Sequence, residues 1–248
     1  DRLDGAAMKR LGIAVANVAG GSNTALAEYT VSLALVLMRR FAWADAEIKK
    51  GNYVDFRKQM ISENLTGLED MTVGVIGLGS IGLAVATAFH RMGSKIVYHD
   101  PALKDPTDAD QISALALPLE DVLKLSDVVT LHVPLIPETE GLIGDTQLSS
   151  MKPGSILIHA ARGGVVDEMA LAQHLTTGHI GGAAVDVYSS EPPEADTPLF
   201  SLNGDAAQRV IFPPHIAGVT RQAWAKLFQV AWDNVERVLA GNDPINRV

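Results

Sequence analysis

The sequence of 248 residues has no cysteine, few basic residues and no long apolar run. Without cysteine there are no disulfide bonds, no thiolate metal ligands and no cysteine nucleophile, and the chain is compatible with a reducing cytoplasm, where we expect it. Lysine and arginine number 20 against 29 aspartates and glutamates, which gives a formal net charge of −9. Because nucleic acids are bound through clustered basic residues, this balance argues against a nucleic-acid partner.

The most apolar stretch near the start, Val31–Met38, lies between Glu28 and the basic pair Arg39-Arg40. It is much shorter than the roughly 20 residues that cross a bilayer, so it predicts a buried helix and no membrane anchor. No basic segment with a cleavage site precedes it, and we therefore expect no secretion signal.

Helical periodicity marks both ends of the chain. Apolar residues recur at helical spacing through Asn23–Phe41, which predicts one long helix, and the more polar residues 42–70 predict a helical connector and loop. A second amphipathic helix is predicted over Arg221–Leu239, with Gly241 as its C-terminal cap.

Short apolar runs rich in β-branched and aliphatic residues occupy the middle of the chain, and they are typical of buried parallel strands. The runs are Val73–Ile76, Lys95–Tyr98, Val128–Val133, Ser155–Ile158, Ala183–Val187 and Val210–Phe212. Segments of helical composition lie between them, namely Ile81–Met92, Pro118–Leu125, Thr146–Ser150 and Glu168–Thr177. This alternation predicts an α/β fold with a Rossmann-type, doubly wound parallel sheet.

A glycine triplet stands between the first predicted strand and its helix. Gly77 allows a tight turn, Gly79 lets the backbone approach a pyrophosphate, and Gly82 lets helix and strand pack closely. The free N–H groups near Ser80 and Ile81 would then face the diphosphate along the helix dipole. Such a triplet also occurs in tight turns without any ligand, so its context has to decide.

The context is an acidic residue at the end of the next predicted strand. Asp100 follows Lys95–Tyr98, where a carboxylate would accept hydrogen bonds from the adenosine ribose hydroxyls. A 2′-phosphate would be repelled there, and residues 101–103 contain no arginine to bind it. The sequence therefore favours NAD over NADP as the cofactor.

Three ionisable residues follow later strands, at the sheet edge where ligands bind in open α/β folds. They are Arg162, Glu191 and His215. Each also has an ordinary structural reading, as a surface ion-pair arginine, a solvated loop glutamate and a satisfied histidine beside prolines. Their shared placement after strand ends rich in glycine or proline favours a catalytic role.

These residue types suit hydride transfer between NADH and a 2-keto acid. Histidine can give a proton to the developing alkoxide and take it back, and a glutamate on its other ring nitrogen fixes the tautomer. The planar arginine fork can hold the substrate carboxylate and polarise the carbonyl group. The redox chemistry itself belongs to the cofactor, and no metal is expected.

At this point the sequence resembles the D-isomer-specific 2-hydroxyacid dehydrogenase family. The similar segments are Asn23–Glu28, Val73–Gly82, Val97–Pro101, Leu131–Pro134 with Glu138-Thr139, Ala160–Asp167, Asp186–Pro192 and Pro214–Gly218. The resemblance implies that Arg162, Glu191 and His215 are catalytic, with Arg162 and His215 also facing the cofactor. It further implies that Asp186 contacts the nicotinamide carboxamide and that Val133, Pro134, Ala160, Ala161 and Gly218 line the cofactor cleft.

The resemblance also implies a domain plan. Residues 1–21 are expected to be the remnant of a flavodoxin-like substrate domain, residues 22–217 the NAD-binding domain, and residues 218–248 a helix returning to the substrate domain. Several tens of residues of that first domain are expected to lie outside the chain. A second departure from relatives is His159, where asparagine is common, and we assign it a packing role.

The identity of the histidine's partner bears on the substrate. Formate dehydrogenases of this architecture use glutamine there, whereas Glu191 indicates a hydroxyacid or keto acid of the hydroxypyruvate, glyoxylate or phosphoglycerate type. The competing hypothesis is a non-catalytic NAD-sensing, corepressor-like or scaffold protein.

A third hypothesis is that the 248 residues bind NAD yet are inactive alone. The resemblance also predicts a homodimer with Asn23–Phe41 near the interface, or covered by the other domain.

Overall fold

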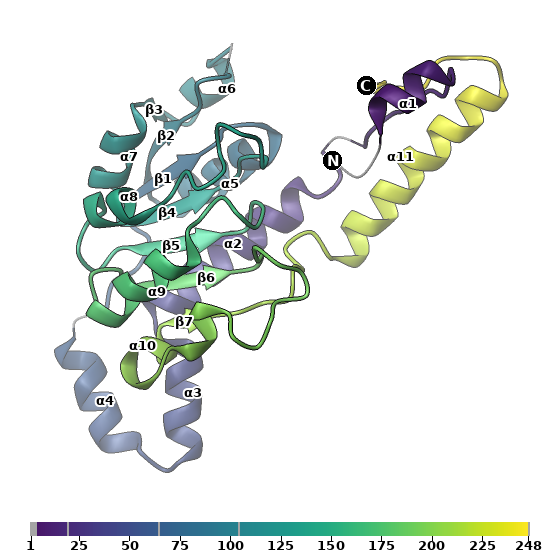
Figure 1. Ribbon diagram of the computed structural model, residues 1–248. Coiled ribbons are helices and arrows are strands. Elements are labelled where there is room, and N and C mark those ends of the chain that lie inside the picture. Colours follow the sequence, from purple (N-terminus) through teal and green to yellow (C-terminus); the bar gives the residue numbers. More distant parts are fainter. Residues whose placement is uncertain (1–3, 19, 64, 104, 248) are drawn as a thin grey trace.

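The computed structural model describes residues 4–18, 20–63, 65–103 and 105–247, and its centre is a seven-stranded parallel sheet (Figure 1). The strands are β1 (Thr72–Ile76), β2 (Lys95–His99), β3 (Leu115–Ala116), β4 (Val128–Leu131), β5 (Ile156–His159), β6 (Gly182–Val185) and β7 (Val210–Ile211). Their order is β3-β2-β1-β4-β5-β6-β7, and every neighbouring pair is parallel. Successive strands are added to one side of β1 up to β3 and to its other side from β4 onward, and this reversal of strand order confirms the Rossmann-type doubly wound fold.

Helices cover both faces of the sheet, as the parallel strands require. The helices α2 (Asn23–Met38) and α5 (Ser80–Arg91) pack on one face, with Val85, Ala86 and Phe89 fully buried. The other face is covered by α7 (Leu119–Leu125), α8 (Asp145–Ser150) and α9 (Glu168–Thr177). The strand ends that precede each crossover therefore gather along one edge of the sheet.

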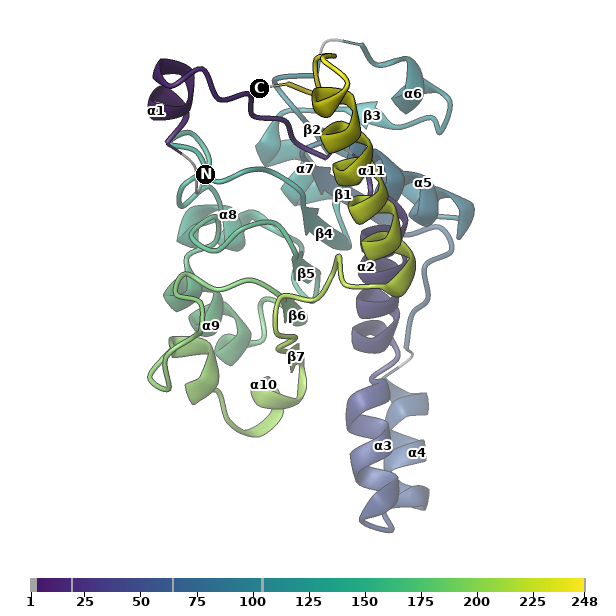
Figure 2. The same ribbon diagram turned by 90° about the vertical axis from the view of Figure 1, so that its right-hand side faces the viewer.

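The predicted helix Asn23–Phe41 is wrong at its end, because α2 stops at Met38. Arg40 adopts a left-handed backbone (φ 56°), and its guanidinium lies 5.5 Å from the ring centre of Trp43. A new helix, α3 (Phe41–Lys49), then forms a hairpin with α4 (Tyr53–Ser62), which extends away from the sheet (Figure 2). The buried side of α2, with Leu33, Ala34 and Leu37, packs on the sheet and on α5.

The structure also contains short elements that the sequence did not predict. Besides β3, they are α1 (Gly5–Arg10), α6 (Thr107–Asp110), the 3₁₀ helix η1 (Pro198–Ser201) and α10 (Gly204–Gln208). Elements this short carry no readable apolar periodicity, which explains why they were missed.

The last helix, α11 (Arg221–Leu239), has the predicted bounds. Thr220 caps its start by accepting a hydrogen bond from the Ala223 amide (3.0 Å), and Gly241 has the positive φ of 78° that ends such helices. Figure 1 shows α11 running away from the sheet towards α1, and Ala16 forms an antiparallel bridge with Arg247. In the described part of the chain, none of the helices combines the length and apolar character needed to span a membrane.

Candidate active site

The turn between β1 and α5 has the geometry of a phosphate cradle. Gly77 has a φ of 89°, and a Cβ added there would lie 2.7 Å from the carbonyl oxygen of His132. A Cβ on Gly82 would collide with the carbonyl of Gly77, so only glycine lets α5 pack this close. A Cβ on Gly79 would meet nothing within 4 Å, so the backbone is open there. Beside this opening, the first-turn amides at Ser80 and Ile81 can donate to an anion.

Asp100 stands beside this turn at the end of β2. Its Oδ2 accepts a hydrogen bond from the Leu78 amide (2.7 Å), and its Oδ1 accepts one from the Ala102 amide (2.9 Å). These two bonds hold the carboxylate next to the open glycine turn. Because each carboxylate oxygen can accept more than one hydrogen bond, the side chain keeps capacity for sugar hydroxyls.

Glu191 and His215 form a direct pair at the same sheet edge. His215 Nδ1 lies 3.0 Å from Oε1 and 2.9 Å from Oε2 of Glu191, and the histidine side chain is half-exposed. Nε2 is thereby left as the ring nitrogen that can face a substrate. The carboxylate also fixes the tautomer, because the nitrogen it contacts must carry a proton to donate.

Charges and hydrogen bonds converge on Glu191. Partial burial raises its pKa, but hydrogen bonds from His215 and the Tyr188 amide, together with the charges of His215 and Arg162, hold the pKa below its usual value. The carboxylate is therefore ionised at neutral pH. The guanidinium of Arg162 is exposed, and its Nη1 donates to the neighbouring carbonyl of Ala161 (2.7 Å). The structure thus brings Arg162, Glu191 and His215 together.

A glycine makes this approach possible. Gly163, which follows Arg162, lies against the backbone of Tyr188, and an added Cβ would collide with the Tyr188 carbonyl. The loop after β5 and the segment after β6 can therefore touch only where one of them lacks a side chain.

Asp186 is not at the surface. It is fully buried, and its carboxylate accepts hydrogen bonds from the Tyr29 hydroxyl (2.9 Å), the Ile216 amide (3.0 Å) and the Ala217 amide (2.9 Å). Val133 and Pro134 follow β4, Ala160 and Ala161 follow β5, and Gly218 follows the His215 loop. All of them lie at the predicted edge, although Ala160 and Ala161 are themselves buried.

Two further groups near this edge escaped the sequence reasoning. Tyr29 sits on a helix face, where a tyrosine is ordinarily a core residue, and nothing in the sequence pairs it with Asp186. His132 follows β4, where burial and the nearby His159 lower its pKa to about 3. Burial lowers the pKa of His159 to about 4, against the opposing effect of a hydrogen bond to the Arg162 backbone. Both imidazoles are neutral at physiological pH.

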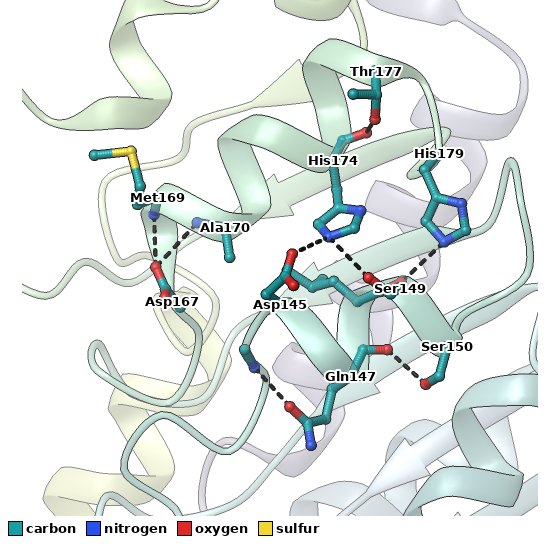
Figure 3. Close-up of polar contacts among 12 residues, drawn as sticks. Asp145, Gln147, Ser149, Ser150, Asp167, Met169, Ala170, His174, Thr177 and His179 are labelled. Atoms are coloured by element: carbon teal, nitrogen blue, oxygen red, sulfur yellow. Dashed lines mark hydrogen bonds and ion pairs between the residues drawn. The ribbon is translucent and has the colours of Figure 1, made fainter.

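A separate cluster on α8 and α9 contains a serine, a histidine and an aspartate (Figure 3). Asp145 Oδ1 lies 2.9 Å from His174 Nε2, and Ser149 Oγ lies 3.5 Å from the same nitrogen. A hydrolase triad needs the acid on one ring nitrogen and the nucleophile on the other. This arrangement therefore does not form a catalytic triad.

Comparison with known proteins agrees with this geometry. Residues 31–217 match the family described as "D-isomer specific 2-hydroxyacid dehydrogenase, NAD binding domain". The chain belongs to this family. Residues 31–217, which contain the central sheet, are accordingly an NAD-binding domain of this family, and this confirms the predicted cofactor.

Individual relatives point the same way. The chain is 36% identical over 241 residues to D-3-phosphoglycerate dehydrogenase of Archaeoglobus fulgidus, covering 97% of this chain and 44% of that protein. It is 34% identical over 250 residues to glyoxylate reductase of Aeropyrum pernix, covering 100% of this chain and 73% of the relative. The apo structure of Rhodotorula graminis D-mandelate dehydrogenase superposes with a TM-score of 0.89 at 28% identity, over all of this chain and 72% of that one. The chain thus spans less than half of the archaeal phosphoglycerate dehydrogenase.

Proposed function

We propose that the protein is an NAD-dependent 2-hydroxyacid dehydrogenase that transfers a hydride between NAD(H) and a small 2-hydroxy or 2-keto acid. The observation that carries the proposal is the contact of Glu191 with His215 beside Arg162, at the sheet edge that holds the glycine turn. An acid–base pair next to a cationic carboxylate-binding group is what this reaction needs from a protein.

Each residue has a distinct task in the proposed reduction. The bound cofactor supplies the hydride that reaches the carbonyl carbon. Arg162 turns from the Ala161 carbonyl to bind the substrate carboxylate and polarise the carbonyl oxygen. His215 donates a proton from Nε2 to that oxygen, and Glu191 stabilises the imidazole in the required orientation. Oxidation of the hydroxyacid reverses these steps, with His215 accepting the hydroxyl proton.

The carboxylate of Glu191 supports a hydroxyacid or keto-acid substrate. A glutamine at this position would suffice for a reaction without proton transfer, such as formate oxidation. We propose a substrate of the hydroxypyruvate, glyoxylate or phosphoglycerate type. In support, the similar enzyme from Archaeoglobus is named for phosphoglycerate and the one from Aeropyrum for glyoxylate.

We propose that the ends of the chain belong to a second, substrate-binding domain of flavodoxin-like fold. Residues 1–21 and 218–248 would contribute to it, and residues 22–217 would form the NAD-binding domain. In support, α11 exposes a row of large apolar side chains, namely Trp224, Phe228, Trp232, Val235 and Leu239. If a substrate domain covers this row, acrylamide should quench Trp224 and Trp232 less in the full-length protein than in the 248-residue chain.

We also propose a homodimer in which the α3–α4 hairpin reaches a second copy. The hairpin extends away from its own sheet, so the sheet does not cover its apolar side chains (Figure 2). The exposed ones are Phe41, Ile48, Tyr53, Val54 and Ile61. Light scattering should give twice the chain mass, and Val54→Asp should lower it to the monomer mass. Leu125→Asp, at an exposed position on α7, is the matched control and should leave the dimer intact. A monomeric unsubstituted protein would overturn this part of the proposal.

The activity is tested by following NADH absorbance in the full-length protein with a panel of 2-keto acids. His215→Ala should lower the rate by roughly two to four orders of magnitude, because general acid–base catalysis contributes about that much. His90→Ala is the control, since His90 is exposed at the end of α5, away from the site. Tight NADH binding without turnover of any keto acid would instead favour an NAD-sensing or scaffold protein.

A further inference from the structure

The backbone at His215 adopts an unusual conformation. Its φ is 55°, in the left-handed region that residues other than glycine rarely occupy. Such conformations persist only where neighbouring groups enforce them, and they cluster at functional sites. The two amides that follow His215 show what enforces it, because the Ile216 and Ala217 N–H groups both donate to the carboxylate of Asp186.

Asp186 is itself held from two sides. Its own amide donates to the carbonyl of His159 (2.9 Å), which ties it to β5. The Tyr29 hydroxyl donates to Oδ1 (2.9 Å) from α2, 157 residues away in the sequence. Among the described residues, no lysine or arginine forms an ion pair with this fully buried carboxylate. Hydrogen bonds therefore carry the whole task of stabilising its charge.

The tyrosine is a permanent donor in this contact. Burial and the charge of Asp186 raise the pKa of Tyr29 far above its ordinary value, so the hydroxyl keeps its proton at every physiological pH. The bond therefore always runs from Tyr29 to Asp186.

We propose that Tyr29 is a positioning residue that acts through Asp186 on His215. The phenol orients the buried carboxylate, the carboxylate fixes the two amides after His215, and these amides set the direction of the imidazole. This inference rests on the proposed dehydrogenase function, because it concerns the group that moves the proton. Two other contacts also hold His215. Glu191 contacts the ring, and the Tyr188 hydroxyl donates to the carbonyl of Pro213 (2.8 Å), two residues before the histidine.

The alternative is that Tyr29 only packs in the core. Tyr29→Phe distinguishes packing from positioning, because it keeps the ring and removes the hydroxyl. In the full-length protein we expect kcat to fall about tenfold, the order of a hydrogen bond to a charged group. The NADH dissociation constant should stay within about twofold of the unsubstituted value, since Asp186 keeps both backbone donors. The deuterium isotope effect on kcat with 4-deuterated NADH should rise, because the chemical step becomes slower.

Two controls separate positioning from lost stability. Thr30→Val removes the neighbouring hydroxyl on α2, which is buried without a hydrogen-bond partner in the described structure, and should leave kcat unchanged. Leu33→Ala removes a buried side chain of the same helix and should lower the thermal midpoint without lowering kcat of the folded enzyme. A kcat for Tyr29→Phe within twofold of the unsubstituted enzyme, or a loss confined to NADH binding, would overturn the proposal.

A measurement without substrate keeps this inference distinct from the proposed function. The ¹⁵N imidazole signals of His215 should shift in Tyr29→Phe, whereas those of the exposed His90 should not. An unchanged His215 spectrum overturns the positioning role whether or not the protein turns over. Failure of the unsubstituted protein to reduce any keto acid overturns the proposed function alone.

Discussion

Acidification should destabilise the fold before any catalytic carboxylate is protonated, because two histidines, the buried His159 and the partly buried His132, are neutral in the folded protein. The pKa is about 3 for His132 and about 4 for His159, against an ordinary value of 6.5. Neither Nδ1 atom is accessible to water or has a hydrogen-bond partner within the described residues. The unfolded chain therefore takes up protons below pH 6.5 that the folded chain does not.

The sign and size of the effect follow from proton linkage. Between about pH 6.5 and pH 4 the unfolded state binds more protons, so the free energy of unfolding falls as the pH falls. At pH 5 each histidine costs about 2 kcal/mol relative to pH 7, and the two together cost about 4 kcal/mol. Typical domains are stable by roughly 5–15 kcal/mol, so this loss is large. Glu191, with a lowered pKa, stabilises at neutral pH and loses its contribution only below about 4.5.

Urea denaturation followed by circular dichroism at pH 7, 6 and 5 measures this slope. The double variant His132→Asn with His159→Asn should flatten the dependence over that range, and each single variant should remove about half of it. The exposed His90→Ala should leave the slope unchanged. An unfolding free energy that is constant from pH 7 to pH 5, or an unaltered slope in the double variant, would refute the assignment of two neutral imidazoles to the folded state.

Three other substitutions test the architecture of the site and its support. Gly163→Ala should cost about 1–3 kcal/mol of stability and most of the turnover, because its Cβ would collide with the Tyr188 carbonyl. Gly67→Ala, where a Cβ meets nothing within 4 Å, is the matched control, and equal effects of both would contradict this reasoning. Arg209→Met should lower the free energy of unfolding by about 3 kcal/mol, because this buried side chain donates to three backbone carbonyls. Asp100→Ser should raise NADPH affinity on the order of tenfold by removing a charge that repels the 2′-phosphate, which fluorescence titration measures; an unchanged ratio of NADH to NADPH affinity would contradict that role.

Local features of this protein could be predicted from the sequence because their causes are local. The glycine turn is one case. Gly77 has a positive φ, and a side chain on Gly82 would collide with the carbonyl of Gly77, so both requirements arise within the turn itself. The helices Glu168–Thr177 and Arg221–Leu239 have the predicted bounds, because an N-cap residue and helical periodicity define each. The parallel sheet followed from the alternation of strands and helices, and its edge brought Arg162, Glu191 and His215 together.

Features that depend on distant contacts were decided only by the tertiary structure. The end of α2 at Met38 accompanies a left-handed Arg40 whose guanidinium lies 3.9 Å from the carboxylate of Glu63 on the far side of the α3–α4 hairpin, and no periodicity in the sequence predicts this end. The burial of Asp186 under Tyr29 joins residues 157 positions apart, so no local pattern could pair them. Residue types and their spacing determined which chemistry this chain can support. Packing between remote elements decided how the catalytic histidine is held, because burial and hydrogen-bond partners are properties of the folded chain.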